Sequence, residues 1–206
     1  VTAPAIEDEV SQNHKNVLQA STRCGKALSF FTPSRRDLAN REWLMFARLN
    51  RETILKRARA PAGDRFDYIL IDCPPALGIL TINALAAADG VLIPSTTEYL
   101  SYRGLTNLEE TIEDIRELIN PNLTVYGTIA TKHDRTTKSR QVLDLMLAEY
   151  DVLAVVKKLT EAVSGIYDGR SVVEQLPDSE ISKAYGLVAD MIVTETFTPL
   201  TEWTWK

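Results

Sequence analysis

Apolar and polar residues form blocks along this chain that change between the period of a strand and the period of a helix. Four short apolar runs bounded by Gly, Pro, Asp or Asn are typical of buried strands: residues 67–72, 90–94, 123–130 and 151–156. Four other segments repeat apolar residues on one helix face: residues 80–88, 104–119, 137–150 and 180–195. Because these strands and helices alternate, the pattern predicts an α/β fold, a parallel β-sheet flanked by helices.

The first third of the chain has a weaker pattern. Residues 27–34 predict a short strand that ends in a turn, and residues 41–60 predict an amphipathic helix with a basic outer face. The sequence APAGD at 60–64 is expected to end that helix. No repeat or linker divides the chain. We therefore predict an irregular segment (1–26), one α/β domain (27–196) and a tail (197–206).

Composition narrows the class of protein only a little. The formal net charge of -5 does not indicate a nucleic-acid binder, although a local basic face is compatible with it. The two cysteines, Cys24 and Cys73, lack metal-binding spacing, so a reducing cytoplasmic setting is the default. The longest apolar stretch, residues 76–94, contains Asn83 and Asp89, which fits a helix followed by a strand better than a membrane span.

One acidic residue stands where a parallel sheet binds ligands. The 67–72 run ends in Asp72, and a carboxylate at the end of a buried strand is costly unless something binds it. An apolar strand that ends in Asp is the Walker B pattern, in which the carboxylate holds Mg²⁺, often through water. The alternative is that Asp72 caps the turn that follows. Pro74 and Pro75 make that turn stiff in either case.

The segment FDYILIDCPPALGILTINALAAADGVLIP (66–94) strongly resembles the Walker B and switch II region of the ParA/MinD ATPases, a branch of the P-loop proteins. The resemblance continues through residues 104–146, more weakly through 155–192, and upstream into FFTPSRRDLANRE (30–42). The flanking segments are more similar to ParA partition proteins than to MinD. The resemblance implies a P-loop NTPase-like fold and ATP hydrolysis.

The resemblance also implies roles for individual residues. Asp72 would be the catalytic acid that orients Mg²⁺ at the ATP phosphates, and the switch that responds to the γ-phosphate would be shaped by Pro74, Pro75 and Gly78. The loop TKHDRT (131–136) is similar to the family's loop at the adenine ring, with Asp134 and Lys132 as the nucleotide-binding candidates. Asp134 as a plain turn residue is the alternative.

In this family an ATP-bound homodimer binds nonspecific DNA, and a ParB-like partner triggers hydrolysis. The implied location is the nucleoid in the cytoplasm. The basic candidates for DNA contact are Lys138, Arg140, Lys157 and Lys158. A solvated helix start and a charged loop are the alternative explanation for these four. Lys157 and Lys158 stand where many ParA proteins have a Pro-Arg pair. The tail VTETFTPLTEWTWK lacks the basic amphipathic helix of MinD, so we expect no membrane binding.

One half of the family's ATP site has no counterpart in this sequence. The Walker A form K-G-G-x-G-K-S/T is absent, and the single Gly-Lys pair, Gly25-Lys26, is followed by Ala27. We therefore expect that roughly the first hundred residues of a ParA protein, with the P-loop strand, are missing. The chain alone would then be inactive and poorly stable. The alternatives are a non-enzymatic pseudo-ATPase or scaffold, and a ParA relative that positions a protein cargo.

Overall fold

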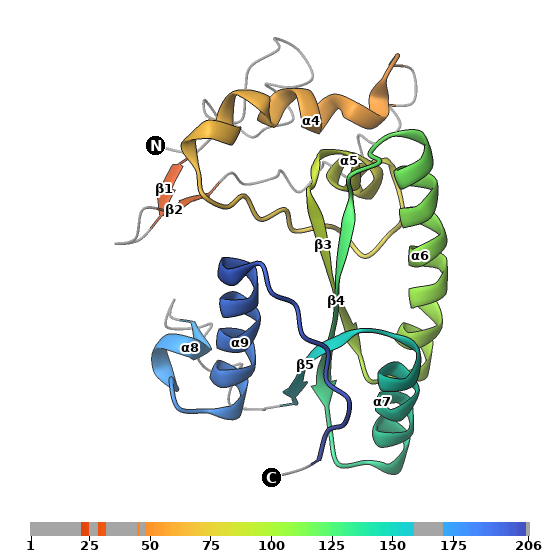
Figure 1. Ribbon diagram of the computed structural model, residues 1–206, viewed down its shortest axis with the longest axis vertical. Helices are drawn as coiled ribbons and strands as arrows, with labels where there is room; N and C mark the ends of the chain where they lie inside the picture. The colour runs from red at the N-terminus through yellow and green to blue at the C-terminus, as the bar shows by residue number, and fades with distance from the viewer. Residues whose placement is uncertain (1–21, 25–28, 32–44, 46–47, 159–170, 205–206) are drawn as a thin grey trace. The chain divides into compact units, whose positions relative to one another are not determined.

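The computed structural model describes residues 22–24, 29–31, 45, 48–158 and 171–204 (Figure 1). The chain divides into two compact units. The first unit comprises Val1–Asp89 and Thr111–Leu123, and the second unit comprises Gly90–Glu110 and Thr124–Lys206. The predicted domain bounds therefore stay a prediction. Among the helices of the described residues, none is long and apolar enough to cross a membrane.

The second unit is built on a parallel sheet. Its strands are β3 (Gly90–Thr96), β4 (Thr124–His133) and β5 (Val152–Lys157), in the order β3-β4-β5 with both pairs parallel. The helix α6 (Tyr99–Leu118) connects β3 to β4, and α7 (Thr137–Glu149) connects β4 to β5. In Figure 1, α7 lies on one side of the strands and α9 (Glu180–Thr194) on the other. The predicted parallel sheet flanked by helices is confirmed.

The core of this unit lies between the sheet and α9. All side chains from Val152 to Val156 are buried, as expected for a strand covered on both faces. The central cluster contains Ile129, Ala154, Val156, Ile181 and Val188. The short helix α8 (Val172–Gln175) precedes α9 and begins with a capping box between Ser171 and Glu174. It was not predicted, because a helix of one turn has no measurable apolar period.

The first unit contains the hairpin of β1 (Thr22–Cys24) and β2 (Ser29–Phe31), with antiparallel pairing. Its helices are η1 (Arg51–Thr53), α4 (Ile54–Arg59), η2 (Ala60–Arg65) and α5 (Ile79–Ala87). Buried Asn83 joins them, since its side chain accepts from the Leu55 amide at 3.1 Å and donates to the Arg51 carbonyl at 2.7 Å. Asn83 is thus a buried residue whose side chain is hydrogen-bonded. The order of α5 and β3 confirms the predicted helix followed by a strand in residues 76–94.

The predicted strand at 67–72 is wrong. Residues 66–78 form neither helix nor strand, and the side chains of Tyr68 and Leu70 are 54% and 85% exposed. A strand exists only when its backbone groups pair with a neighbour, and no described residue pairs with this segment.

The long basic helix predicted for 41–60 is not continuous in its described part, although residue 45 and Ile54–Arg59 are helical. Residues 48–50 form a turn, Asn50 has a left-handed backbone (φ 54°), and α4 itself covers only Ile54–Arg59. The polar face is basic as expected, because Lys56 and Arg57 are exposed while Ala58 is buried. Residues 60–64 are predicted to end the helix. They end its α-helical part, and the chain continues as the 3₁₀ helix η2. Residues 1–21 and 41–44 lie outside the described residues.

Candidate functional site

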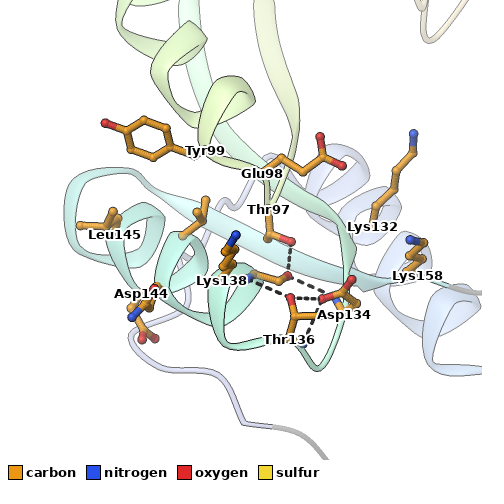
Figure 2. A pocket seen from close by; sticks show the side chains of 13 residues that line it. Thr97, Glu98, Tyr99, Lys132, Asp134, Thr136, Lys138, Asp144, Leu145 and Lys158 are labelled. Atoms are coloured by element: carbon orange, nitrogen blue, oxygen red, sulfur yellow. Dashed lines mark hydrogen bonds between the residues drawn. The ribbon is translucent and has the colours of Figure 1, made fainter.

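A pocket of about 770 Å³ lies in the second unit where the three parallel strands end (Figure 2). This is the edge at which α/β sheets bind ligands, because loops diverge there from the ordered strands. The lining comes from the end of β4, from the segments that follow β3, β4 and β5, and from α7. It comprises Thr97, Glu98, Tyr99, Lys132, Asp134, Thr136, Lys138, Ser139, Gln141, Val142, Asp144, Leu145 and Lys158.

Three buried polar side chains form what we call the floor of the pocket: Thr97, His133 and Ser139. The Thr97 and Ser139 hydroxyl oxygens are 2.6 Å apart, and the Ser139 Oγ lies 2.9 Å from Nδ1 of His133. Burial lowers the pKa of His133, so the ring is neutral at pH 7. A neutral imidazole has one donor and one acceptor nitrogen, so its Nδ1 shares a hydrogen bond with the Ser139 hydroxyl in either tautomer.

Asp134 is held by a turn at the start of α7. Its Oδ1 accepts hydrogen bonds from the Thr136 amide at 3.0 Å and the Thr136 hydroxyl at 2.6 Å. These two bonds lower the pKa of Asp134, so the carboxylate is ionised at neutral pH. The Asp134 amide donates to Ser139 Oγ at 3.2 Å, which links the turn to the floor. Asp134 is therefore both a turn residue and a pocket residue.

The pocket has a mixed chemical lining. Three lysines, Lys132, Lys138 and Lys158, stand beside three carboxylates from Glu98, Asp134 and Asp144. In Figure 2, Lys132 and Lys158 lie to one side of Asp134, and Tyr99 and Leu145 lie to the other. Tyr99 and Leu145 offer surface that suits the faces of a flat ring, and the lysines and carboxylates suit polar groups on its edge.

Lys132 has an uncommon backbone. Its φ is 51°, a left-handed conformation, at an irregularity of the β4–β5 pairing. Such conformations cost about 1–3 kcal/mol in non-glycine residues and gather at functional sites. Directly beyond this irregularity the sheet resumes, because the Lys158 amide donates to the His133 carbonyl at 2.8 Å. The bulge therefore places Lys132 and Lys158 at the same edge.

Not all predicted site residues meet in this pocket. Asp134 and Lys132 line it, as do Lys138 and Lys158, two of the predicted DNA contacts. Arg140 is exposed on α7 and is absent from the lining. The Lys157 side chain is 15% exposed; its Nζ is 4.0 Å from a Glu180 oxygen and 5.9 Å from the centroid of the Trp203 ring.

Asp72, Pro74, Pro75 and Gly78 belong to the first unit, in the segment without regular structure. Asp72 is exposed, and among the described residues no group of three or more His, Cys, Asp or Glu side chains could hold a metal ion. A single carboxylate does fit Mg²⁺ of the kind that keeps several waters and takes other ligands from phosphates. The predicted role of Asp72 stays a prediction.

Sequence reasoning missed most of the floor and the apolar side of the pocket. Thr97, Glu98 and Tyr99 follow directly after β3, so the rule that ligands bind beyond strand ends could have found them. No comparable signal marks His133 or Ser139, whose contact depends on the start of α7 folding back on β4.

Comparison with known proteins identifies the family. The family described as "AAA domain" matches residues 6–125, which is more than half of the chain. The chain belongs to this family, and its relatives place it among the ParA/MinD-like P-loop ATPases.

Two relatives illustrate the similarity. The chain is 41% identical over 132 residues to the uncharacterized protein Rv1708 of Mycobacterium tuberculosis strain H37Rv, which is 64% of this chain and 42% of that protein. It is 43% identical over 113 residues to the chromosome partitioning protein ParA of Myxococcus xanthus, 54% of this chain and 40% of that protein. The chain thus spans less than half the length of these relatives.

The fold is also shared with solved structures. One is cobyrinic acid a,c-diamide synthase from Mycobacterium smegmatis with a bound ATP analogue and magnesium, at a TM-score of 0.79 and 28% sequence identity. The alignment covers 97% of this chain and 78% of that one. Proteins of this fold carry different names, so the fold alone does not decide the reaction.

Proposed function

We propose that this chain is part of an ATPase of the DNA-partition type, and that the pocket of the second unit takes the base of the nucleotide. The observation that carries the proposal is the meeting of Lys132 and Asp134 at the carboxyl edge of the parallel sheet. Both residues belong to the loop that is similar to the family's loop at the adenine ring. A solved relative of this fold holds an ATP analogue and magnesium.

The lining supplies the contacts that adenine requires. The ionised Asp134 is an acceptor for the amino group on the edge of the base. Tyr99, Val142 and Leu145 offer apolar surface to the ring. In the same proposal Asp72 orients Mg²⁺ through water, and Pro74, Pro75 and Gly78 shape the switch that follows it. ATP and Mg²⁺ are therefore the proposed cofactors.

Nucleotide binding tests the proposal. In protein produced from its complete reading frame, Asp134→Ala should weaken the binding of fluorescent ATP and ADP with Mg²⁺ by about tenfold or more, because a charged hydrogen bond is lost. Asp190→Ala, an exposed acid on α9, is the matched control and should bind as wild type does. Unchanged affinity in Asp134→Ala would refute the base pocket. A wild-type protein that binds no nucleotide would favour the non-enzymatic scaffold.

The catalytic part of the proposal has a separate test. Asp72→Ala should abolish ATP hydrolysis while ADP binding remains, since the carboxylate organises the metal and its waters rather than the base. Hydrolysis is measured as phosphate release, with Asp67→Ala as the control in the same exposed segment. Wild-type turnover in Asp72→Ala would show that this acid only caps its turn.

The proposal extends to DNA and protein partners. The ATP-bound homodimer would bind nonspecific DNA at the nucleoid in the cytoplasm, and a ParB-like partner would stimulate hydrolysis. Of the four basic candidates, Arg140 is exposed outside the pocket. Arg140→Ala should therefore weaken DNA binding and lower its salt dependence without changing nucleotide affinity. Lys138→Ala should change nucleotide affinity, because Lys138 lines the pocket. Equal effects of both variants on both ligands would contradict this division.

A further inference from the structure

The last described residues, from Glu195 to Thr204, form neither helix nor strand, yet they are held against the sheet at three points. The Phe197 ring stacks on Tyr126 with the centroids 4.1 Å apart and the planes 5° from parallel. The Leu200 amide donates to the Val152 carbonyl at 2.7 Å. The Trp203 ring meets His133 edge to face, with the centroids 4.9 Å apart. We call residues 197–203 the strap.

The strap ends on the residue that supports the floor of the pocket. His133 is fully buried, and its ring contacts Trp203 as well as the two floor hydroxyls. On the floor, Nδ1 lies 2.9 Å from Ser139 Oγ and 3.4 Å from Thr97 Oγ1. Trp203 itself is absent from the lining of the pocket. The ring of His133 is thus packed between Trp203 of the strap and the other two floor residues, Thr97 and Ser139.

Trp203 has a second contact, with the side chain of Lys157. Lys157 Nζ lies 5.9 Å from the centroid of the Trp203 ring, within the range of a cation–π contact. The same ammonium is 4.0 Å from a Glu180 oxygen at the start of α9. An aromatic ring with both an edge contact and a cation nearby has a defined orientation. The strap is therefore an ordered part of the second unit.

We propose that Trp203 and His133 are positioning residues of the pocket: the strap holds the His133 ring so that Ser139 keeps Asp134 in place. The chain of contacts is continuous, because the Ser139 hydroxyl that faces His133 also accepts from the Asp134 amide at 3.2 Å. Its effect on nucleotide binding rests on the function proposed above. Neither residue touches the ligand in this proposal.

The direct physical consequence concerns the orientation of the His133 ring. Removing the Trp203 ring takes away the edge-to-face contact that holds the buried imidazole. The imidazole can then turn, and its Nδ1 moves away from the Ser139 hydroxyl. The Asp134 amide would then lose a well-oriented acceptor. The turn that holds the Asp134 carboxylate would loosen, although every lining residue is still present.

Amide hydrogen exchange measured by NMR tests this without any ligand. Trp203→Ala should speed exchange of the Asp134 amide by about fivefold or more, the equivalent of one ordinary hydrogen bond, and Trp203→Phe should restore it. Tyr185→Ala, which removes an exposed ring from α9, is the control and should leave this amide unchanged. Wild-type exchange at Asp134 in Trp203→Ala would overturn the proposal.

A second variant keeps the test decisive if Trp203→Ala does not fold. His133→Phe retains a ring against Trp203 but removes Nδ1, so it should also speed exchange at Asp134. An unchanged exchange rate in His133→Phe would likewise overturn the proposal. Both variants should weaken nucleotide binding by about fivefold. If the wild-type protein binds no nucleotide, the proposed function fails, whereas the exchange rates still decide the role of the strap.

Discussion

Two apolar runs of this chain look alike in sequence and differ in structure. VLAVV at 152–156 lies in β5, which is hydrogen-bonded to β4, and each of these five residues is buried. YILID at 68–72 is equally rich in strand-forming residues, yet it is unpaired among the described residues, and Leu70 is 85% exposed. The comparison shows that an apolar run sets the capacity to form a strand, whereas a neighbouring strand decides whether it forms.

The largest expected effect comes from making the same substitution in both runs. Leu153→Ala in β5 should lower the free energy of unfolding by about 2–5 kcal/mol, because a fully buried side chain leaves a cavity. Leu70→Ala should change it by less than about 0.5 kcal/mol, because Leu70 loses little contact. Urea denaturation followed by circular dichroism measures both. A large loss in Leu70→Ala would mean that the segment is buried in solution and would break the comparison.

Substituting alanine for a glycine in the paired strand β4 and for a glycine in the helix α9 is expected to change stability in opposite directions. Gly127 in β4 has φ 144°, and an added Cβ would lie 2.6 Å from the Asp151 carbonyl oxygen, so Gly127→Ala should destabilise by about 1–3 kcal/mol. Gly186 in α9 has open space around such a Cβ, so Gly186→Ala should stabilise by about 0.5–1 kcal/mol. The shift of the thermal unfolding midpoint shows whether each variant is more or less stable than wild type. A neutral or stabilising Gly127→Ala would show that the close approach of Gly127 to the Asp151 carbonyl is absent in solution.

The smallest expected effect is a pH dependence of stability that comes from His133 at the end of the paired strand β4. Burial lowers the pKa of His133 below its usual 6.5, an effect that Arg140 and Lys157 add to and that Asp134 and Asp144 oppose. As the pH falls below 6.5, His133 in the unfolded chain takes up a proton before His133 in the folded chain does. The contribution of neutral His133 to the free energy of unfolding is therefore complete above pH 6.5 and is lost as the pH falls below it. The slope is at most about 1.4 kcal/mol per pH unit.

Unfolding at pH 7.5 and 5.5 measures this dependence, with His133→Gln as the comparison. The variant should lose less stability than wild type between these two values, because Gln does not titrate. An equal loss in both proteins would assign the pH dependence to other groups.

Much of the second unit was predictable, because its signals are local. The strand at 90–94, the helix at 104–119 and the helix at 180–195 correspond to β3, α6 and α9, although α6 begins earlier, at Tyr99. Asp134 and Lys132 were predicted through the family pattern and line one pocket. The contact between His133 at the end of β4 and Ser139 in α7 could not be predicted, since a polar residue carries no signal of which partner it meets after folding.

The sequence alone determined the α/β class, the membership in the ParA/MinD-like family and the positions of most helices and strands. These follow from apolar periods and motifs that residues close in the chain carry by themselves. Only the tertiary structure decided that residues 68–72 stay unpaired and that Trp203 meets His133 beneath the pocket. Pairing and packing join residues far apart in the chain, and their outcome depends on which neighbours the folded sheet provides.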